Sequence, residues 1–319
     1  MEQRKNRIDV HHHIIPPFFR DALQSIGGDP SGWPTPAWDL KSDDDFSASH
    51  GINTTIFSLT APGPDVVEGE PAIRLARETN NYLASLRDQN PSRYGFFAAV
   101  PSLTSVSAAI AEITYALDVL KADGVTLLTR YGPGNQYLGH AAFAPIWDLL
   151  DSKAAVVFVH PTHSANTELI SPLLPQPIVD YPHETTRAAM DLIMSDTVRT
   201  HPNCKVILSH AGGTLPYLAK RAAYGLDHTK LIPKSTRDFL EEVGSFYFDL
   251  ALSSSTEVVA MLRQFAKPDH ILYGSDYPYA PSGMISDLVR EFDTIPLDSD
   301  VAHAINRGNA LKLFPRFEA

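Results

Sequence analysis

The chain repeats a strand-then-helix pattern along most of its length. Short apolar runs rich in Val, Ile and Phe alternate with longer amphipathic segments, which is typical of parallel strands joined by helical crossovers. The run Ala-Val-Val-Phe-Val-His at 155–160 is apolar almost throughout, as expected of a strand buried on both faces. The predicted strands cover residues 8–15, 54–59, 94–100, 124–128, 155–160, 205–210, 246–250 and 271–276.

Eight strands alternating with helices in 319 residues predict an α/β fold of the (β/α)8 TIM-barrel type. A doubly wound open sheet would place a Gly-rich phosphate loop after the first strand, where this chain has Pro16-Pro17. No composition break divides the chain, so residues 1–319 are predicted to form one domain. The Gly-, Pro- and Trp-rich stretch at about 16–45 is predicted to be a small inserted lid. A long loop is predicted at 161–183, before a helix at 184–196.

Composition excludes several classes of partner. The chain has 26 basic and 37 acidic residues, and a net charge of −11 argues against nucleic acid or an anionic membrane as its target. No run approaches the roughly eighteen apolar residues that a membrane helix needs. The single cysteine, Cys204, excludes an internal disulfide and fits a reducing compartment. We therefore expect a soluble cytoplasmic protein.

Histidines gather at the end of the first predicted strand, in the run Asp9-Val10-His11-His12-His13. Side chains alternate along a strand, so His11 and His13 share one face and His12 points the other way, towards the helices. Two neutral imidazoles side by side can chelate a divalent metal. Asp9 lies on the same face of the strand as His11 and His13, two residues before His11. It is predicted to hydrogen-bond these histidines from the next layer of the barrel interior.

Three further polar residues close other predicted strands: His160, His210 and Asp276. Taken singly, a histidine at a strand end is usually just hydrogen-bonded, and an Asp before Tyr-Pro often forms a turn. In a barrel, however, the carboxyl ends of the strands all meet at one mouth, where such enzymes carry their chemistry. Together with the paired histidines of the first strand, these residues predict one site at that mouth.

This set of residues resembles the amidohydrolase superfamily. The phrases DVHHHIIPPFF, VVFVHP, ETTRAAMDLI, ILSHAGGTLPYL and ILYGSDYPYAP resemble its aminocarboxymuconate-semialdehyde decarboxylase and 6-methylsalicylate decarboxylase branch. The resemblance extends from Ile8 to about Phe314. It implies a metal-dependent carboxy-lyase that releases CO2 from a hydroxy-aromatic acid without oxidation, and it implies a homodimer.

The resemblance also implies a metal site. One Zn²⁺, or alternatively Mn²⁺, would be bound by His11, His13, His160 and Asp276. His210 would lie beside the open position of the metal. Binuclear relatives use a carboxylated Lys at the end of strand four, but that strand ends here in Leu127-Leu128-Thr129-Arg130, so we expect a single metal.

The expected reaction follows from this site. A 2-hydroxybenzoate would chelate the metal through its carboxylate and phenolic oxygens, and protonation of the carbon that bears the carboxylate would precede loss of CO2. Either Asp276 or His210 would deliver that proton. The alternative activity is hydrolysis of a lactone or amide. The absence of a Lys at the end of strand four argues against it. A third possibility is a barrel that binds a ligand without catalysis. Such a protein would be expected to have lost at least one of the five polar residues at the strand ends, and none is missing.

Four residues are candidates for binding the substrate. Arg187 either pairs with a substrate carboxylate or forms a surface salt bridge, and Trp33, Trp38 and Tyr181 either wall the pocket or pack on neighbouring helices. The muconate-semialdehyde enzyme holds a second carboxylate with an Arg after strand two, but residues 60–65 contain none here. A hydroxybenzoate such as a methylsalicylate is therefore favoured over a dicarboxylate.

Overall fold

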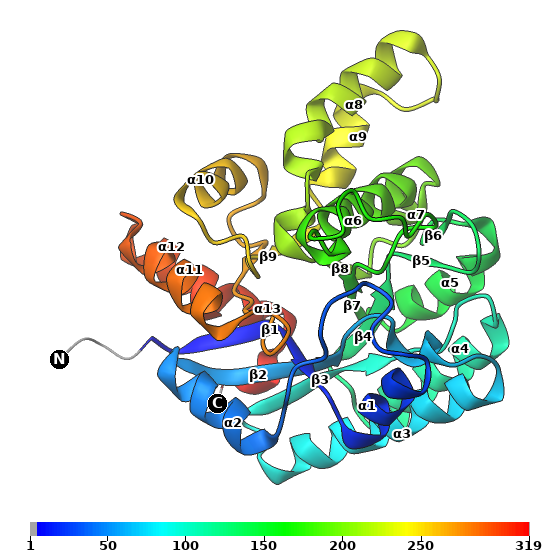
Figure 1. Cartoon of the computed structure of the whole chain (residues 1–319). Coiled ribbons are helices and arrows are strands. Elements are labelled where there is room, and N and C mark those ends of the chain that lie inside the picture. The colour runs from blue at the N-terminus through cyan, green and yellow to red at the C-terminus, as the bar shows by residue number, and fades with distance from the viewer. Residues whose placement is uncertain (1–4, 319) are drawn as a thin grey trace.

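Eight parallel strands form the centre of the molecule (Figure 1). The structure is a computed structural model that describes residues 5–318, so residues 1–4 and 319 of the predicted domain lie outside the described residues. Neighbours in this sheet follow one another along the chain except where β5 (Arg130–Tyr131) and β6 (Gln136–Tyr137), which pair only with each other, lie between β4 and β7. The strands are β1 (Arg7–Ile14), β2 (Ile52–Leu59), β3 (Tyr94–Ala99), β4 (Gly124–Leu128), β7 (Val156–His160), β8 (Lys205–Leu208), β9 (Tyr247–Asp249) and β10 (Ile271–Leu272).

The segment after β10 closes the barrel against β1. The Val10 amide donates to the Tyr273 carbonyl at 3.1 Å, and the Asp276 amide donates to the His11 carbonyl at 2.8 Å. The predicted last strand, 271–276, is therefore too long: regular strand ends at Leu272, although the pairing continues irregularly. Gly274 permits this close approach, because a Cβ there would lie 2.8 Å from the Cβ of His11.

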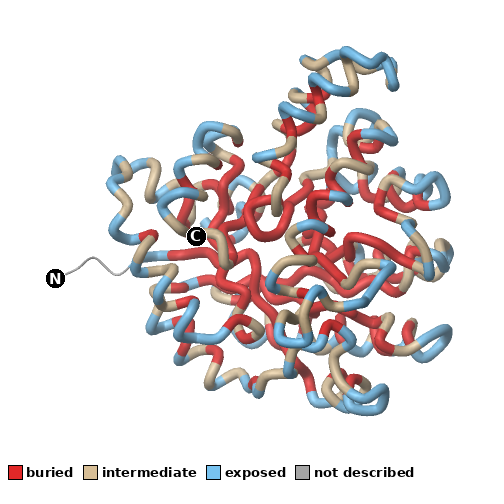
Figure 2. Tube along the Cα trace, turned by 45° about the horizontal axis from the view of Figure 1, so that its top comes forward, coloured by how far each residue is buried: buried red, intermediate tan, exposed pale blue. Residues whose placement is uncertain are grey.

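Helices surround the strands, and Figure 2 shows the buried chain running through the centre and the exposed chain on the outer helices. Within residues 5–318, no helix has the length and apolar character needed to span a membrane. The helices are α1 (Pro17–Ser25), α2 (Leu40–Ser49), α3 (Glu70–Gln89), α4 (Val106–Thr114), α5 (Ala144–Ser152), α6 (Gln176–Met194), α7 (Thr197–Thr200), α8 (Leu215–Thr229), α9 (Thr236–Val243), α10 (Thr256–Phe265), α11 (Ser282–Thr294), α12 (Ser299–His303) and α13 (Asn309–Leu313).

The barrel interior is apolar below the predicted site. Phe158 lies beneath the ring of His11, with ring centroids 4.9 Å apart, and packs on Phe97 at 5.2 Å. Phe314 and Phe317 from the C-terminal segment join the same apolar cluster. The polar strand ends therefore lie on a closely packed apolar layer.

The stretch predicted as a lid, about 16–45, contains α1 and the start of α2. Between them the chain runs to the carboxyl end of the barrel, where Trp33 Nε1 donates to the Tyr279 carbonyl at 3.0 Å. The Ser31 carbonyl accepts from the Gln176 amide at 3.4 Å. The stretch thus contacts the loop after β10 and the first residue of α6, and its action as a lid stays a prediction.

The predicted loop at 161–183 is wrong in its second half, because α6 begins at Gln176 rather than at 184. The prolines of this stretch suggested a loop. Pro175 precedes the helix and Pro177 lies in its first turn, where the missing N–H breaks no helical hydrogen bond. Pro182 does lie inside α6, where it removes one helical hydrogen bond, and the burial of its neighbour Tyr181 helps to offset that loss.

Candidate active site

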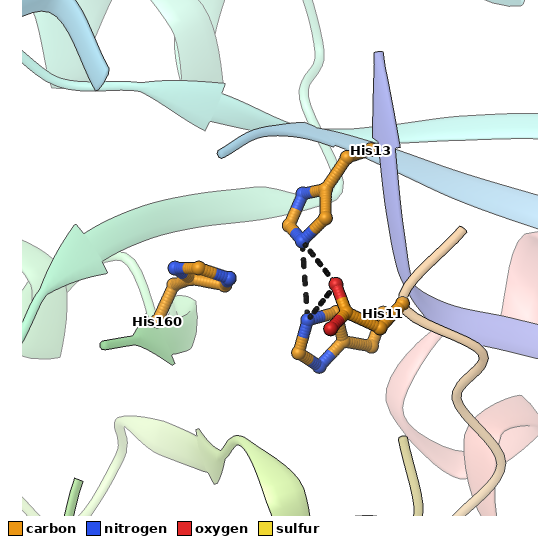
Figure 3. A group of neighbouring side chains, drawn as sticks. His11, His13 and His160 are labelled. Atoms are coloured by element: carbon orange, nitrogen blue, oxygen red, sulfur yellow. Dashed lines mark hydrogen bonds and ion pairs between the residues drawn. The ribbon is translucent and has the colours of Figure 1, made fainter. Parts of the chain in front are cut away.

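The structure brings His11, His13, His160 and Asp276 together at the carboxyl end of the barrel. Figure 3 shows the three histidines of this group. One ligand atom from each lies within 4.8 Å of the others, and all four residues are buried. His11 Nε2 is 3.1 Å from His13 Nε2, and Asp276 Oδ1 lies 3.4 Å and 3.2 Å from these two nitrogens. Residues far apart in the sequence thus form one compact group of nitrogen and oxygen acceptors.

Hydrogen bonds orient two of the imidazoles towards this centre. His13 Nδ1 lies 2.9 Å from Ser58 Oγ, which itself donates to the His12 carbonyl at 3.2 Å. Ser58 must therefore accept from His13, so Nδ1 of His13 carries a proton. His160 Nδ1 donates to the Pro161 carbonyl at 2.8 Å. Both rings consequently turn an unprotonated Nε2 towards the other ligands, which is the form that binds a metal.

Electrostatics favour a cation at the centre of the cluster. Burial lowers the pKa of His13 and His160, so both are neutral. Burial also acts to lower the pKa of His11, but Asp249 and Asp276 outweigh it and raise this pKa to about 10. Burial opposes ionisation of Asp276, yet His11 holds its pKa well below the usual value. Without a metal, the proton on His11 is therefore the positive charge that balances Asp276, and a divalent metal would take its place.

The donor set suits a divalent metal. Three imidazole nitrogens and one carboxylate match a zinc site with room for substrate, and they also tolerate manganese. Because Nδ1 of His13 and His160 is already hydrogen-bonded, the nitrogens that face the centre are free to coordinate. The arrangement supports a divalent metal at this site.

His210 lies next to the cluster, with its ring centroid 4.8 Å from that of His11. Its Nδ1 donates to the Ala251 carbonyl at 3.0 Å, and burial lowers its pKa, which leaves a neutral ring with Nε2 as an acceptor. His210 and Asp276 both have left-handed backbone conformations, with φ of 54° and 64°. Such strain in a non-glycine residue persists only where the surroundings hold it, as at many functional sites.

A cavity of about 180 Å³ opens above these residues. Roughly 150 Å³ is enough to hold benzene in an apolar protein cavity, so one substituted ring fits. His160, His210 and Asp276 form its polar end, and among the described residues its lining includes no Lys or Arg. Its walls are mostly apolar or aromatic, and they include Trp33, Ala61, Ile178, Tyr181, Tyr279 and Met284.

Two of the four predicted substrate-binding residues line this cavity, namely Trp33 and Tyr181. Trp38 does not: it is buried, and its Nε1 donates to Asp43 Oδ2 at 2.7 Å. Arg187 is also elsewhere, with its side chain 54% exposed and 3.8 Å from Glu184 Oε1. Its guanidinium lies over the Tyr137 ring, 5.1 Å from the centroid. The structure thus corrects these two predictions, because Trp38 has a packing role and Arg187 forms the surface pair.

Asp9 does not contact the rings of His11 and His13 as predicted. The pairing of β1 with β2 shifts register between Asp9 and His12, so strict alternation fails at this point. Asp9 Oδ2 lies 3.0 Å from His12 Nδ1, and its Oδ1 accepts from the backbone amides of His11 and Ser275, each at 3.1 Å, so it supports His11 only through the backbone. The prediction for His12 is confirmed, because its Nε2 contacts Asp43 Oδ2 of α2 at 2.8 Å.

The sequence interpretation missed Asp249, the actual partner of the His11 ring. Its Oδ2 lies 2.9 Å from His11 Nδ1, and both residues are fully buried. A signal was present, because Asp249 is the one charged residue in the predicted strand at 246–250. A charge inside an apolar strand needs a buried partner.

Comparisons with known proteins agree with this geometry. The family described as amidohydrolase matches residues 8–316. The chain is 50% identical over 320 residues to a 6-methylsalicylic acid decarboxylase of Penicillium expansum, covering 98% of this chain and 97% of that protein.

Two solved structures share the fold. An amidohydrolase II crystal structure has a TM-score of 0.90 at 30% identity, covering 97% of this chain and 100% of the other. A dihydroxybenzoic acid decarboxylase from a Polaromonas species, solved with bound manganese and 2-nitroresorcinol, has a TM-score of 0.83 at 22% identity, covering 99% and 98%. The family match over nearly the whole described barrel and the 50% identical relative show that the chain belongs to the amidohydrolase family.

Proposed function

We propose that this chain is a metal-dependent decarboxylase that releases CO2 from a hydroxy-aromatic monocarboxylic acid of the 6-methylsalicylate type. The cavity carries the proposal: it has the size of one substituted ring, aromatic and apolar walls, and a cluster of metal-ligand type at one end. The 6-methylsalicylic acid decarboxylase that is 50% identical over nearly the whole chain supports the same reaction.

We propose that the metal is held by His11, His13, His160 and Asp276. Zn²⁺ is our first choice because three of the four ligands are imidazole nitrogens, and Mn²⁺ is the alternative. When bound, the metal would neutralise the carboxylate and phenolic oxygens of the substrate.

The protein would contribute positioning and proton transfer. Trp33 and Tyr181 wall the ring, and the apolar lining excludes water from the reacting carbon. Asp276 would take the phenolic proton and pass it to the carbon that carries the carboxylate. The bond to the carboxylate then breaks, its electron pair restores the aromatic ring, and CO2 leaves. The remaining phenolate takes up a proton from solvent.

His210 is the competing proton carrier. Because its Nδ1 is bonded to the Ala251 carbonyl, its Nε2 is the atom that can accept a proton and return it. It lines the cavity beside His160 and Asp276, within reach of the same substrate position.

The charge of the cavity supports a monocarboxylate. Its lining includes Asp29 and Asp276 but, among the described residues, no Lys or Arg. A second carboxylate on the ring would therefore lie near acidic groups without a cationic partner. The Tyr279 side chain also lines the cavity, and its buried hydroxyl has no hydrogen-bond partner within residues 5–318.

The test is a substrate panel. Protein loaded with Zn²⁺ or Mn²⁺ is incubated with 6-methylsalicylate, other 2-hydroxybenzoates, a benzene dicarboxylate and several aryl lactones, with CO2 trapped from each. We expect 6-methylsalicylate to yield 3-methylphenol and CO2 in equal amounts. Lactone hydrolysis without gas would establish the hydrolase alternative instead.

We further propose a cytoplasmic homodimer in which residues 1–319 form one barrel domain and about 16–45 serve as a lid over the cavity. Analytical ultracentrifugation tests the dimer. Limited proteolysis with and without a nonreactive benzoate tests the lid, since cleavage between α1 and α2 should slow when the cavity is filled.

A further inference from the structure

We infer that Asp249 is a positioning residue that serves two parts of the site at once. It holds the His11 ring in the tautomer that is protonated on Nδ1 and has Nε2 free for the metal. It also accepts a hydrogen bond from the backbone of the turn that carries His210. The inference rests on the proposed metal site and adds a residue that neither the motifs nor the ligand cluster of that site includes.

The hydrogen bonds of Asp249 define this role. The residue ends β9 and is fully buried. Its Oδ2 lies 2.9 Å from His11 Nδ1, and its Oδ1 accepts from the backbone amides of His210 at 3.1 Å and Ala251 at 3.0 Å. The carboxylate is thus fully satisfied, as a buried charge must be.

The bond to His11 selects one tautomer. An ionised carboxylate only accepts hydrogen bonds, so His11 must carry a proton on Nδ1. Its Nε2, which faces His13 Nε2 at 3.1 Å, is then the atom that coordinates a metal. A partner that could donate instead would favour the opposite tautomer, in which Nε2 carries the proton and cannot coordinate.

The second bond holds a strained turn. His210 and Ala211 have φ of 54° and 56°, so two consecutive non-glycine residues are in the left-handed region. Asp249 Oδ1 accepts from the His210 amide at the start of this turn. The His210 ring donates from Nδ1 to the Ala251 carbonyl, two residues after Asp249. One carboxylate therefore sets the relative placement of a proposed metal ligand and a proposed proton carrier.

The chain contains a matched comparison. Asp43 is also fully buried and contacts an imidazole nitrogen, His12 Nε2, at 2.8 Å. His12 lies on the opposite side of β1 from the ligand cluster, between Asp9 and Asp43. Removing the charge of Asp43 disturbs a buried His–Asp pair of the same type without touching a ligand ring.

The experiment compares D249N, D249A and D43N. Metal-free protein is titrated with Zn²⁺ in a calorimeter, which reads affinity without any need for turnover, and thermal unfolding is followed by circular dichroism. In D249N the amide NH2 would face His11 Nδ1 and stabilise the wrong tautomer, so we expect zinc affinity to fall by about 10- to 100-fold. D249A favours neither tautomer of His11, so its zinc affinity should fall less than that of D249N. D43N should bind zinc within about threefold of wild type, although its melting temperature should be lower.

The inference is overturned if D249N binds zinc as tightly as wild type, or if D249N and D43N lose affinity equally. Should D249N fail to fold, D249A takes its place. The inference is then overturned if D249A binds zinc as tightly as wild type, or if D249A and D43N lose affinity equally. A wild-type protein that binds neither Zn²⁺ nor Mn²⁺ would refute the proposed function. A metal-binding, active wild type whose Asp249 variants bind normally would refute only the role of Asp249.

Discussion

Asp65 should destabilise the folded protein at neutral pH, and D65N should relieve this effect. Asp65 lies in the short helical turn Gly63–Val66 directly after β2, and its Oδ1 is buried without a hydrogen-bond partner in the described part of the chain. Burial raises its pKa from 3.8 to about 6, and hydrogen bonds from Ser102 offset this only in part.

The sign and size of the effect follow from the raised pKa. The folded state favours the protonated carboxyl, so the stability from Asp65 is fully present below pH 3.8 and is lost as pH rises through about 6. Each pKa unit is worth about 1.4 kcal/mol, which gives a cost of at most about 3 kcal/mol above that range. Because the residue is only partly buried, we expect D65N to gain about 1–2 kcal/mol at pH 7.5.

Urea unfolding at pH 7.5 and pH 4, followed by tryptophan fluorescence, measures this difference. The unfolding midpoint of D65N should exceed that of wild type at pH 7.5, and the two should nearly coincide at pH 4. D21N, at an exposed position of α1, serves as the control and should change neither midpoint. A gain of equal size at both pH values, or a loss at pH 7.5, would show that the ionised Asp65 is not the cause.

Three further predictions concern the site and its surroundings. D276N should lose both metal and CO2 release, whereas H210N should keep the metal and most of its kcat; a kcat lowered by about 10²- to 10⁴-fold in H210N would instead make His210 the proton carrier. W33A should raise KM because it opens the cavity wall, while W38A should lower stability by about 3–5 kcal/mol and leave the KM of the folded fraction unchanged. Burial, followed by the charge of Asp151, raises the pKa of Cys204 to about 12, so iodoacetamide at pH 8 should label the thiol slowly until urea unfolds the chain; fast labelling of the native protein would contradict this burial.

The barrel could be predicted because its signals are local. Each strand is a short apolar run, and the histidines and aspartate at the strand ends can be identified by their position in the run. Parallel strands then place those ends on one face whatever the intervening loops do. This is why His11, His160 and Asp276 could be assigned to one site although each lies at the end of a different predicted strand.

The missed features depend on distant or irregular structure. Asp249 is separated from His11 by 238 positions, so no spacing links them. A register shift in β1 turned Asp9 towards His12, which strict alternation does not anticipate. The start of α6 was missed because Pro177 and Pro182 argue against a helix locally, while burial of Tyr181 favours one only in the folded protein.

The joint between the first and last strands has a consequence for folding. The amides of residues 275 and 276 bond to the His11 carbonyl, so the backbone contact that completes the ring of strands also delivers the Asp276 carboxylate to the histidines. An unfinished barrel that lacks its final strand would offer the three imidazoles without the Asp276 carboxylate. Tight binding of a divalent ion should therefore begin only after the first and last strands have paired. The time course of metal binding during refolding would then report when the barrel closes.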